Sequence, residues 1–149
     1  MRRAEALAGI ALINGLAGND TIIGSTGADV IEGGVGSDRL TGGADADTFD
    51  FNVASHSRGS TIDTITDFEL GLDLIDFTTL DADGNSGTLD SFMFVGTAAF
   101  SGTAGELRYD NTSVAGQTRI LADIDGNGAA DMEIRLTGSY TLSTDDFGL

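Results

Sequence analysis

The chain has 149 residues, enough for one domain with a modest core, and its 24 acidic and 7 basic residues give a net charge of −17. That charge argues against nucleic acid as a partner, because little in the chain could neutralise phosphates. The absence of Cys excludes disulfides and thiolate zinc sites, and no apolar run approaches the roughly 20 residues of a membrane-spanning helix.

Residues 1–13 contain two Arg and a short apolar stretch, which Glu5 interrupts. No cleavage site follows, so we expect no N-terminal signal peptide. Residues 5–13 also fit the nine-residue period that begins at residue 14, with Gly9 and Ile13 in frame and Ala11 where that period has Asp. We therefore expect residues 1–13 to form a degenerate repeat, an N-terminal cap that completes no metal site.

Residues 14–49 are four consecutive nine-residue blocks: NGLAGNDTI, IGSTGADVI, EGGVGSDRL and TGGADADTF. Each block has Gly at its second position, Asp at its seventh and a large apolar residue at its ninth. A fixed period of this kind indicates a solenoid, in which each repeat stacks on the next. The Gly-rich part of each block predicts a turn and the apolar end a very short strand, so two blocks make one coil of turn, strand, turn and strand.

In this arrangement blocks one and three share one edge of the solenoid, and blocks two and four share the other. Each edge collects carboxylates and backbone carbonyls, so that without a cation Asp20 would repel Asp38, and Asp29 would repel Asp47. Ca²⁺ accepts six to eight oxygen ligands in flexible geometry, whereas Mg²⁺ demands a small octahedral shell. The blocks therefore predict about two to four bound Ca²⁺ ions. A flexible Gly-rich linker is the alternative, which four blocks in one frame disfavour.

After Phe49 the period stops and apolar residues alternate with polar ones, which predicts strands. The predicted strands are Thr48–Val53, Thr61–Phe68, Asp73–Phe77, Phe92–Val95, Glu106–Tyr109, Thr118–Ala122 and Met132–Leu136. We expect an all-β fold, with a parallel β-roll over residues 14–49. An antiparallel, sandwich-like cap over residues 50–149 would continue the roll within one domain.

Other chemical patterns in the chain are weaker. Residues 123–131 imitate the start of an EF-hand loop, but Ile134 stands where the loop needs Glu, which favours a hairpin turn; residues 80–87 carry the same partial pattern. His56 is the only His, and neither H-E-x-x-H nor G-x-S-x-G is present. We expect His56 to be a surface loop residue and the chain to have no catalytic site.

Five stretches, in this order, resemble the C-terminal domain of serralysin-type secreted metalloproteases: GGADADTFDF, DTITDFELGLDLIDF, FSGTAGELRYD, DIDGNGAADMEIRLTG and LSTDDFGL. Repeat modules of alginate epimerases are similar, and the nonapeptides resemble the RTX repeat. The resemblance implies a parallel β-roll, several bound Ca²⁺ ions and a C-terminal type I secretion signal. Residues 145–149 resemble the acidic and apolar ending of such secreted proteins, although Gly148 departs from the usual apolar residue.

The resemblance also implies the metal ligands. Side-chain ligands would be Asp20, Asp29, Asp38 and Asp47. Backbone carbonyl ligands would be Leu16, Gly18, Ser25, Gly27, Gly34, Gly36, Gly43 and Asp45. Asp63 and Asp73 match the acids of the family's closing site, with Asp67 as a lesser candidate, whereas an acid is common where His56 stands.

The predicted function is a non-catalytic, calcium-binding module that folds on Ca²⁺ outside the cell and supports type I secretion and folding of an attached enzyme. The implied partners are Ca²⁺, the type I secretion apparatus and an N-terminal catalytic domain. The alternative is a module that binds an alginate-like polyuronate, for which the available cations are Arg39, Arg58, Arg108, Arg119 and Arg135. An autonomous enzyme is disfavoured, because no catalytic set can be assembled.

Overall fold

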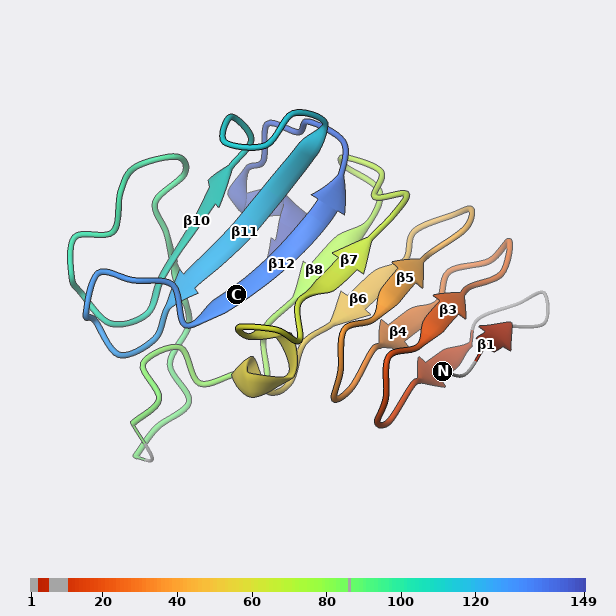
Figure 1. Ribbon diagram of the computed structural model, residues 1–149, viewed down its shortest axis with the longest axis horizontal. Coiled ribbons are helices and arrows are strands. Elements are labelled where there is room, and N and C mark those ends of the chain that lie inside the picture. The colour runs from red at the N-terminus through yellow and green to blue at the C-terminus, as the bar shows by residue number, and fades with distance from the viewer. Residues whose placement is uncertain (1–2, 6–10, 86) are drawn as a thin grey trace.

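The computed structural model describes residues 3–5, 11–85 and 87–149, and it confirms an all-β fold (Figure 1). Its strands are β1 (Arg3–Glu5), β2 (Leu12–Asn14), β3 (Thr21–Ile23), β4 (Val30–Glu32), β5 (Arg39–Thr41), β6 (Thr48–Asp50), β7 (Asp63–Ile65), β8 (Leu74–Asp76), β9 (Met93–Phe94), β10 (Glu106–Asp110), β11 (Gln117–Asp123), β12 (Met132–Thr137) and β13 (Phe147–Gly148). Two short 3-10 helices are η1 (Ala54–Ser57) and η2 (Thr144–Asp146). Within the described residues no helix has the length and apolarity that crossing a bilayer requires.

The first strands alternate between two parallel sheets. Sheet A stacks β1, β3, β5 and β7, and sheet B stacks β2, β4, β6 and β8. Hydrogen bonds between successive coils join residues 18 apart, as the bond between Asp29 and Asp47 illustrates. The predicted coil of two blocks is therefore the unit of the roll. Residues 1–2 and 6–10 of the predicted degenerate repeat lie outside the described residues, but β2 keeps the period.

The core of the roll is two columns of apolar side chains, one from each sheet. Pairing places Ile22, Leu40, Ile65 and Leu136 in the column of sheet A, and Ile13, Ile31, Phe49, Ile75 and Phe147 in that of sheet B. Most are fully buried: Ile22, Ile31, Leu40 and Phe49 are 0% exposed. Paired strands lie about 4.8 Å apart, so each coil covers the apolar residue of the coil before it.

The roll continues beyond residue 49, although the cap was expected to start at residue 50. β7 and β8 pair in parallel with β5 and β6, so they form a fourth pair of stacked strands. The offset rises to 25 residues at Asp38 and Asp63, because η1 and the loop after it are inserted between the coils. The nonapeptide period is therefore lost from the sequence while the strand stacking is kept.

The cap is built onto this last coil from the C-terminal half. β12 extends sheet A by pairing in parallel with β7, and β13 extends sheet B by pairing in parallel with β8. Beyond β12 the order β11, β10 is antiparallel, as predicted for the cap. Aromatic rings fill the space between the layers, where Phe77 packs against Phe51, Phe92 and Phe147.

Ser57 of η1 ties the roll to the cap. Its side chain is 0% exposed, donates to the Glu133 carbonyl of β12 and accepts the Asp63 N–H of β7 at 3.0 Å. We expect Ser57→Ala to lower the free energy of unfolding by about 1–3 kcal/mol, because a buried N–H then lacks its acceptor. Thermal unfolding in calcium checks this, with Ser60→Ala at an exposed position as the control. Equal melting temperatures for the two variants would contradict the assigned bonds.

Candidate metal centre

One edge of the roll carries a ladder of buried carboxylates, formed by Asp20, Asp38 and Asp63. The Asp20 N–H donates to Oδ1 of Asp38 at 2.7 Å, and the Asp38 N–H donates to Oδ1 of Asp63 at 2.8 Å. All three are at most 3% exposed. The carboxylates of Asp38 and Asp63 therefore reach from their own turns to the backbone of the preceding coil, and Asp63 takes the next place in the series despite its irregular spacing in the sequence.

The other edge carries a second ladder with the same bonding, formed by Asp29, Asp47 and Asp73. The N–H groups of Ala11, Asp29 and Asp47 donate to Oδ1 of Asp29, Asp47 and Asp73 at 2.8, 2.8 and 3.0 Å. Ala11 holds the seventh position of the degenerate repeat and offers a backbone donor but no carboxylate. The structure thus brings all six sequence-predicted Asp side chains into two ladders.

The Gly at the second position of each block makes room for these carboxylates. A Cβ on Gly33 would lie 2.6 Å from Oδ2 of Asp38, and one on Gly42 would lie 2.3 Å from Oδ2 of Asp47. A Cβ on Gly24 would meet the Gly42 carbonyl at 2.0 Å. The second oxygen of each carboxylate therefore lies within its own turn, and the coils stack too closely for a side chain at this position.

The turns place the eight predicted carbonyls in two different geometries. The third and fifth residues have left-handed φ in blocks one, three and four, which include the non-Gly residues Leu16 (φ 70°) and Asp45 (φ 65°). In block two neither Ser25 nor Gly27 is left-handed, and the Ser25 N–H donates to Oδ2 of Asp29 at 2.5 Å. Three turns thus share one backbone form, whereas the second turn closes on its own carboxylate.

Two of the predicted carbonyls already accept hydrogen bonds from the next coil. The Leu16 carbonyl accepts the Val35 N–H at 2.8 Å, and the Ser25 carbonyl accepts the Ala44 N–H at 3.3 Å. A carbonyl oxygen has two lone pairs, so each can still ligate a cation. The turns therefore remain a source of oxygen ligands after the coils have stacked.

The charge of the ladders is poorly balanced by the protein itself. Burial raises the pKa of Asp63 to about 8 and that of Asp47 to about 6, and neighbouring Asp carboxylates add to both shifts. Burial and the Asp20 carboxylate also raise the pKa of Asp38, although the Asp20 N–H and His56 act against the rise. Oδ2 of Asp38 is buried without a hydrogen-bond partner among the described residues. A cation at this edge would remove the repulsion and supply that partner.

The donor set fits Ca²⁺. Carboxylate and carbonyl oxygens are the hard ligands that this ion prefers, and its variable coordination number suits turns of two different shapes. Mg²⁺ requires a smaller and more regular shell. No thiolate is available, and the single His56 lies in η1 rather than on a ladder, which argues against a Zn²⁺ site.

The two ladders end differently at the cap. Asp63 has its N–H capped by the Ser57 hydroxyl, whereas Asp73 donates its N–H to the Glu69 carbonyl at 2.9 Å. Asp67, the lesser candidate, closes the fourth turn instead: its two oxygens accept the N–H groups of Gly42 and Gly43 at 2.9 and 3.0 Å.

The sequence did not identify Ser57 as a partner of the ladder, because no local pattern around it reveals which N–H its hydroxyl accepts.

Two further groups of acids lie outside the ladders. Residues 123–131 form the predicted hairpin turn between β11 and β12, and carboxylate oxygens of Asp123, Asp125 and Asp131 lie within 4.8 Å of one another. The Asp123 carboxylate accepts three backbone N–H groups, and Asp131 accepts two more as well as Arg58. The carboxylates of Asp123 and Asp131 therefore already have donors, from the backbone of the turn and from Arg58. The second group, Asp81, Asp83 and Asp90, is more exposed.

Stacked turns with a carboxylate ladder along each edge define the chain as a β-roll protein. The family model described as peptidase M10 serralysin C terminal matches residues 7–147, so the chain belongs to that family. Serralysin A of Dickeya chrysanthemi is 29% identical over 98 residues, which are 66% of this chain and 19% of that protein. The chain therefore spans about a fifth of the length of this relative.

Two solved structures have a similar fold. The AlgE6R3 subunit of the Azotobacter vinelandii mannuronan C5-epimerase has a TM-score of 0.67 and 27% identity, over 97% of this chain and 77% of that one. The AlgE6R2 subunit of the same enzyme has a TM-score of 0.62 and 24% identity, over 97% of this chain and 89% of that one. Both likenesses agree with the predicted resemblance to epimerase modules.

Proposed function

We propose that this chain is a calcium-binding module whose two carboxylate ladders close around Ca²⁺. The observation that carries the proposal is the ladder of Asp20, Asp38 and Asp63, in which buried carboxylates repel one another and one oxygen of Asp38 has no donor among the residues that the structure describes. Carbonyls of neighbouring turns complete each site. Membership of the serralysin C-terminal family supports the proposal.

The module is secreted by a type I route and folds after export. Where calcium is scarce, repulsion within the ladders keeps the repeats unfolded, and an unfolded chain can pass a narrow type I channel. Extracellular modules bind Ca²⁺ in a range of about 10⁻⁴–10⁻³ M. Each site at one hundred times its Kd adds about 2.7 kcal/mol to folding. The folded roll then supports folding of an attached catalytic domain, as the partial match to a longer serralysin suggests.

A calcium titration of the EDTA-stripped protein by far-UV circular dichroism tests the switch. We expect Ca²⁺ to produce a steep gain of β signal and Mg²⁺ to produce little. Asp38→Asn should weaken calcium binding about tenfold or more, because a charged ligand is lost while the amide oxygen can still accept the Asp20 N–H. Asp145→Asn removes the same charge at an exposed position of η2 and serves as the control.

The outcome that contradicts the proposal is a fully folded protein in EDTA that calcium leaves unchanged. Equal calcium affinities for Asp38→Asn and Asp145→Asn would contradict the ladder assignment in particular. Calorimetry on the same samples gives the number of Ca²⁺ ions bound, for which we propose two to four as the sequence predicted.

A second candidate function is binding of an acidic polysaccharide. The observation that favours it is the likeness to the AlgE6R3 subunit, which belongs to an enzyme that acts on mannuronan. An acidic protein needs a surface of positive charge for such a polymer. Retention by a polyuronate, with no retention by a neutral glucan, supports this candidate.

A further inference from the structure

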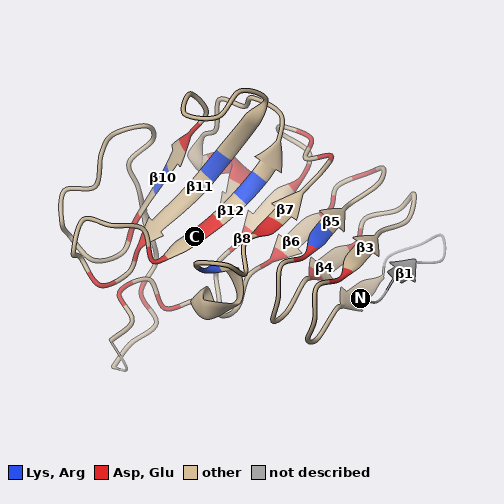
Figure 2. Ribbon diagram, in the orientation of Figure 1, with Lys and Arg blue, Asp and Glu red and all other residues tan. Residues whose placement is uncertain are grey.

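The positive charge of this acidic chain is gathered on one surface. Of the five arginines with described side chains, four belong to strands of sheet A, where Figure 2 shows blue segments: Arg39, Arg108, Arg119 and Arg135. Each is exposed or half-buried and has buried neighbours along the chain, so these side chains lie on the outer face of the sheet. The outer face of sheet B carries acids instead, at Glu32, Asp50 and Asp76, and no described Arg. The two faces of the molecule therefore differ in the charge that they offer to a ligand.

Three of these arginines stand in one row across sheet A. Cα pairing joins Arg39 of β5 to Thr64 of β7, then Thr64 to Arg135 of β12. Arg135 in turn pairs with Arg119 of β11. Paired residues of neighbouring strands point to the same face. We name Arg39, Thr64, Arg135 and Arg119 the arginine row, and it crosses from the roll into the cap.

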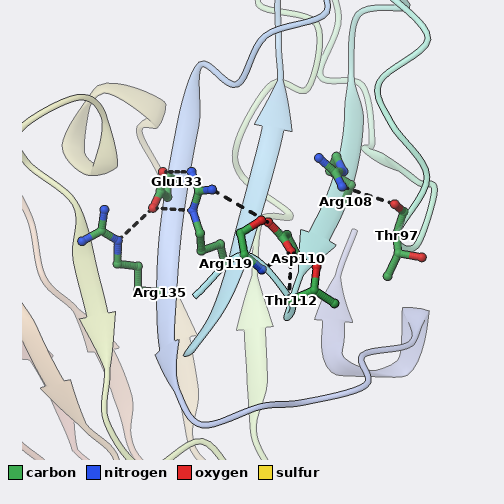
Figure 3. A network of polar contacts seen from close by, with 8 residues as sticks. Thr97, Arg108, Asp110, Thr112, Arg119, Glu133 and Arg135 are labelled. Carbon is green, nitrogen blue, oxygen red and sulfur yellow. Dashed lines mark hydrogen bonds and ion pairs between the residues drawn. The ribbon is translucent and has the colours of Figure 1, made fainter. Parts of the chain in front are cut away.

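One end of the arginine row already holds a carboxylate. Glu133 lies between Arg119 and Arg135 (Figure 3): it accepts Nε and Nη2 of Arg119 at 3.0 and 2.7 Å, and Nε of Arg135 at 2.8 Å. Paired arginines would otherwise repel each other. Parallel hydrogen bonds from a planar guanidinium are the geometry in which Arg recognises carboxylates.

The rest of the row keeps its donors free. The terminal nitrogens of Arg135 point away from Glu133 in Figure 3, and this side chain is 39% exposed. Arg39 is exposed and has no ion pair among the residues that the structure describes. Thr64 lies between them, so the two arginine backbones are two strand spacings, about 10 Å, apart. This arrangement offers two guanidinium groups and a hydroxyl in one row on the outer face of sheet A.

We infer that the arginine row is the binding site for an acidic polysaccharide, with Arg39 and Arg135 holding successive carboxylates and Thr64 bonding a sugar hydroxyl. The ligand class rests on the second candidate function, while the site rests on the pairing of the strands. Single-stranded nucleic acid fits less well, because the row has no aromatic side chain on which bases could stack. The acidic face of sheet B repels the same polymer and so directs it to sheet A.

Calorimetric titration of the calcium-loaded protein with short oligogalacturonates tests the inference, with dextran oligosaccharides as the neutral control. We expect binding of the uronate alone, weakened by added salt. Arg39→Gln should weaken it about tenfold or more, because a charged hydrogen-bonding partner is lost. Arg39→Lys should recover only part of the affinity, since it keeps the charge but loses the planar fork. Arg58→Gln makes the same charge change in the loop after η1 and should bind like the wild type.

The experiments distinguish a failure of the arginine row from a failure of the calcium function. A protein that folds with calcium but binds no oligogalacturonate, or that loses equal affinity in Arg39→Gln and Arg58→Gln, overturns the arginine row and leaves the calcium function standing. A protein that binds the uronate but shows no calcium response by circular dichroism overturns the calcium function alone. Tighter binding of a single-stranded oligonucleotide than of the uronate would also overturn the inference.

Discussion

A Gly36→Ala variant is expected to lose the stacking of the first and third turns. A Cβ at this position would lie 1.9 Å from the Gly18 carbonyl oxygen, and the backbone φ of +148° is one that side-chain-bearing residues rarely adopt. To avoid this clash the coils must separate, and the hydrogen bonds of Val35 with Leu16 and Gly18 are then broken. We expect a loss of about 3–5 kcal/mol in the free energy of unfolding, measured in saturating calcium.

Gly59→Ala is the matched control for this variant. Gly59 also has a positive φ, +64°, but a Cβ there would meet nothing within 4 Å. Gly59→Ala should therefore lower the free energy of unfolding only by the cost of a left-handed backbone, about 1–2 kcal/mol. Circular dichroism and thermal unfolding of both variants separate the two contributions. If both variants lose the same stability, the close approach of the coils in the roll is contradicted.

The period of the sequence was sufficient to predict the roll. Each block repeats the Gly that the carboxylate needs, the Asp that bonds the preceding coil and the apolar residue that fills the core, so three physical requirements recur together. The same period predicted that Asp20 lies near Asp38 and Asp29 near Asp47, which their hydrogen bonds confirm, whereas Asp63 and Asp73 were inferred from the family resemblance. The strands after Phe49 were predicted from alternation alone, and the structure places all seven of them close to their expected ranges.

What the sequence did not reveal depends on contacts between distant segments. Nothing in the residues around Ile134 indicates that β12 pairs in parallel with β7, although this pairing extends sheet A and creates the arginine row. The different backbone of the second turn was also not predicted, because Ser25 bonds the Asp29 carboxylate only once the turn has closed. Similarly, Ser57 becomes an acceptor for Asp63 only when η1 packs beside the roll.

The carboxylate ladders and the arginine row also show why charge composition alone is a poor guide to binding. A net charge of −17 suggests a uniformly acidic surface. The fold instead buries six Asp side chains along the two edges and leaves four Arg on one outer face. The acids of the proposed cation sites are therefore separated in space from the arginines of the proposed anion site.

Acid is expected to stabilise the calcium-free protein. Burial raises the pKa of Asp47 to about 6 and of Asp63 to about 8, whereas both have ordinary values near 3.8 in the unfolded chain. Between about pH 4 and pH 8 the folded state thus binds more protons than the unfolded state. Its free energy of unfolding must therefore fall as the pH rises through this window. Protons thereby remove the repulsion between ladder carboxylates, which is the role proposed for calcium.

Circular dichroism in EDTA at a series of pH values, with urea unfolding at each pH where the protein is folded, measures this effect, which we expect to be on the order of several kcal/mol across the window. Asp63→Asn should flatten the profile between about pH 6 and 8, because the amide carries no charge to bury. Asp145→Asn should leave the profile unchanged. Calcium affinity of the wild type should rise over the same range, since Ca²⁺ must displace the bound protons. A calcium-free protein that is most stable at pH 8 would refute the raised pKa values, and with them the electrostatic basis of the switch.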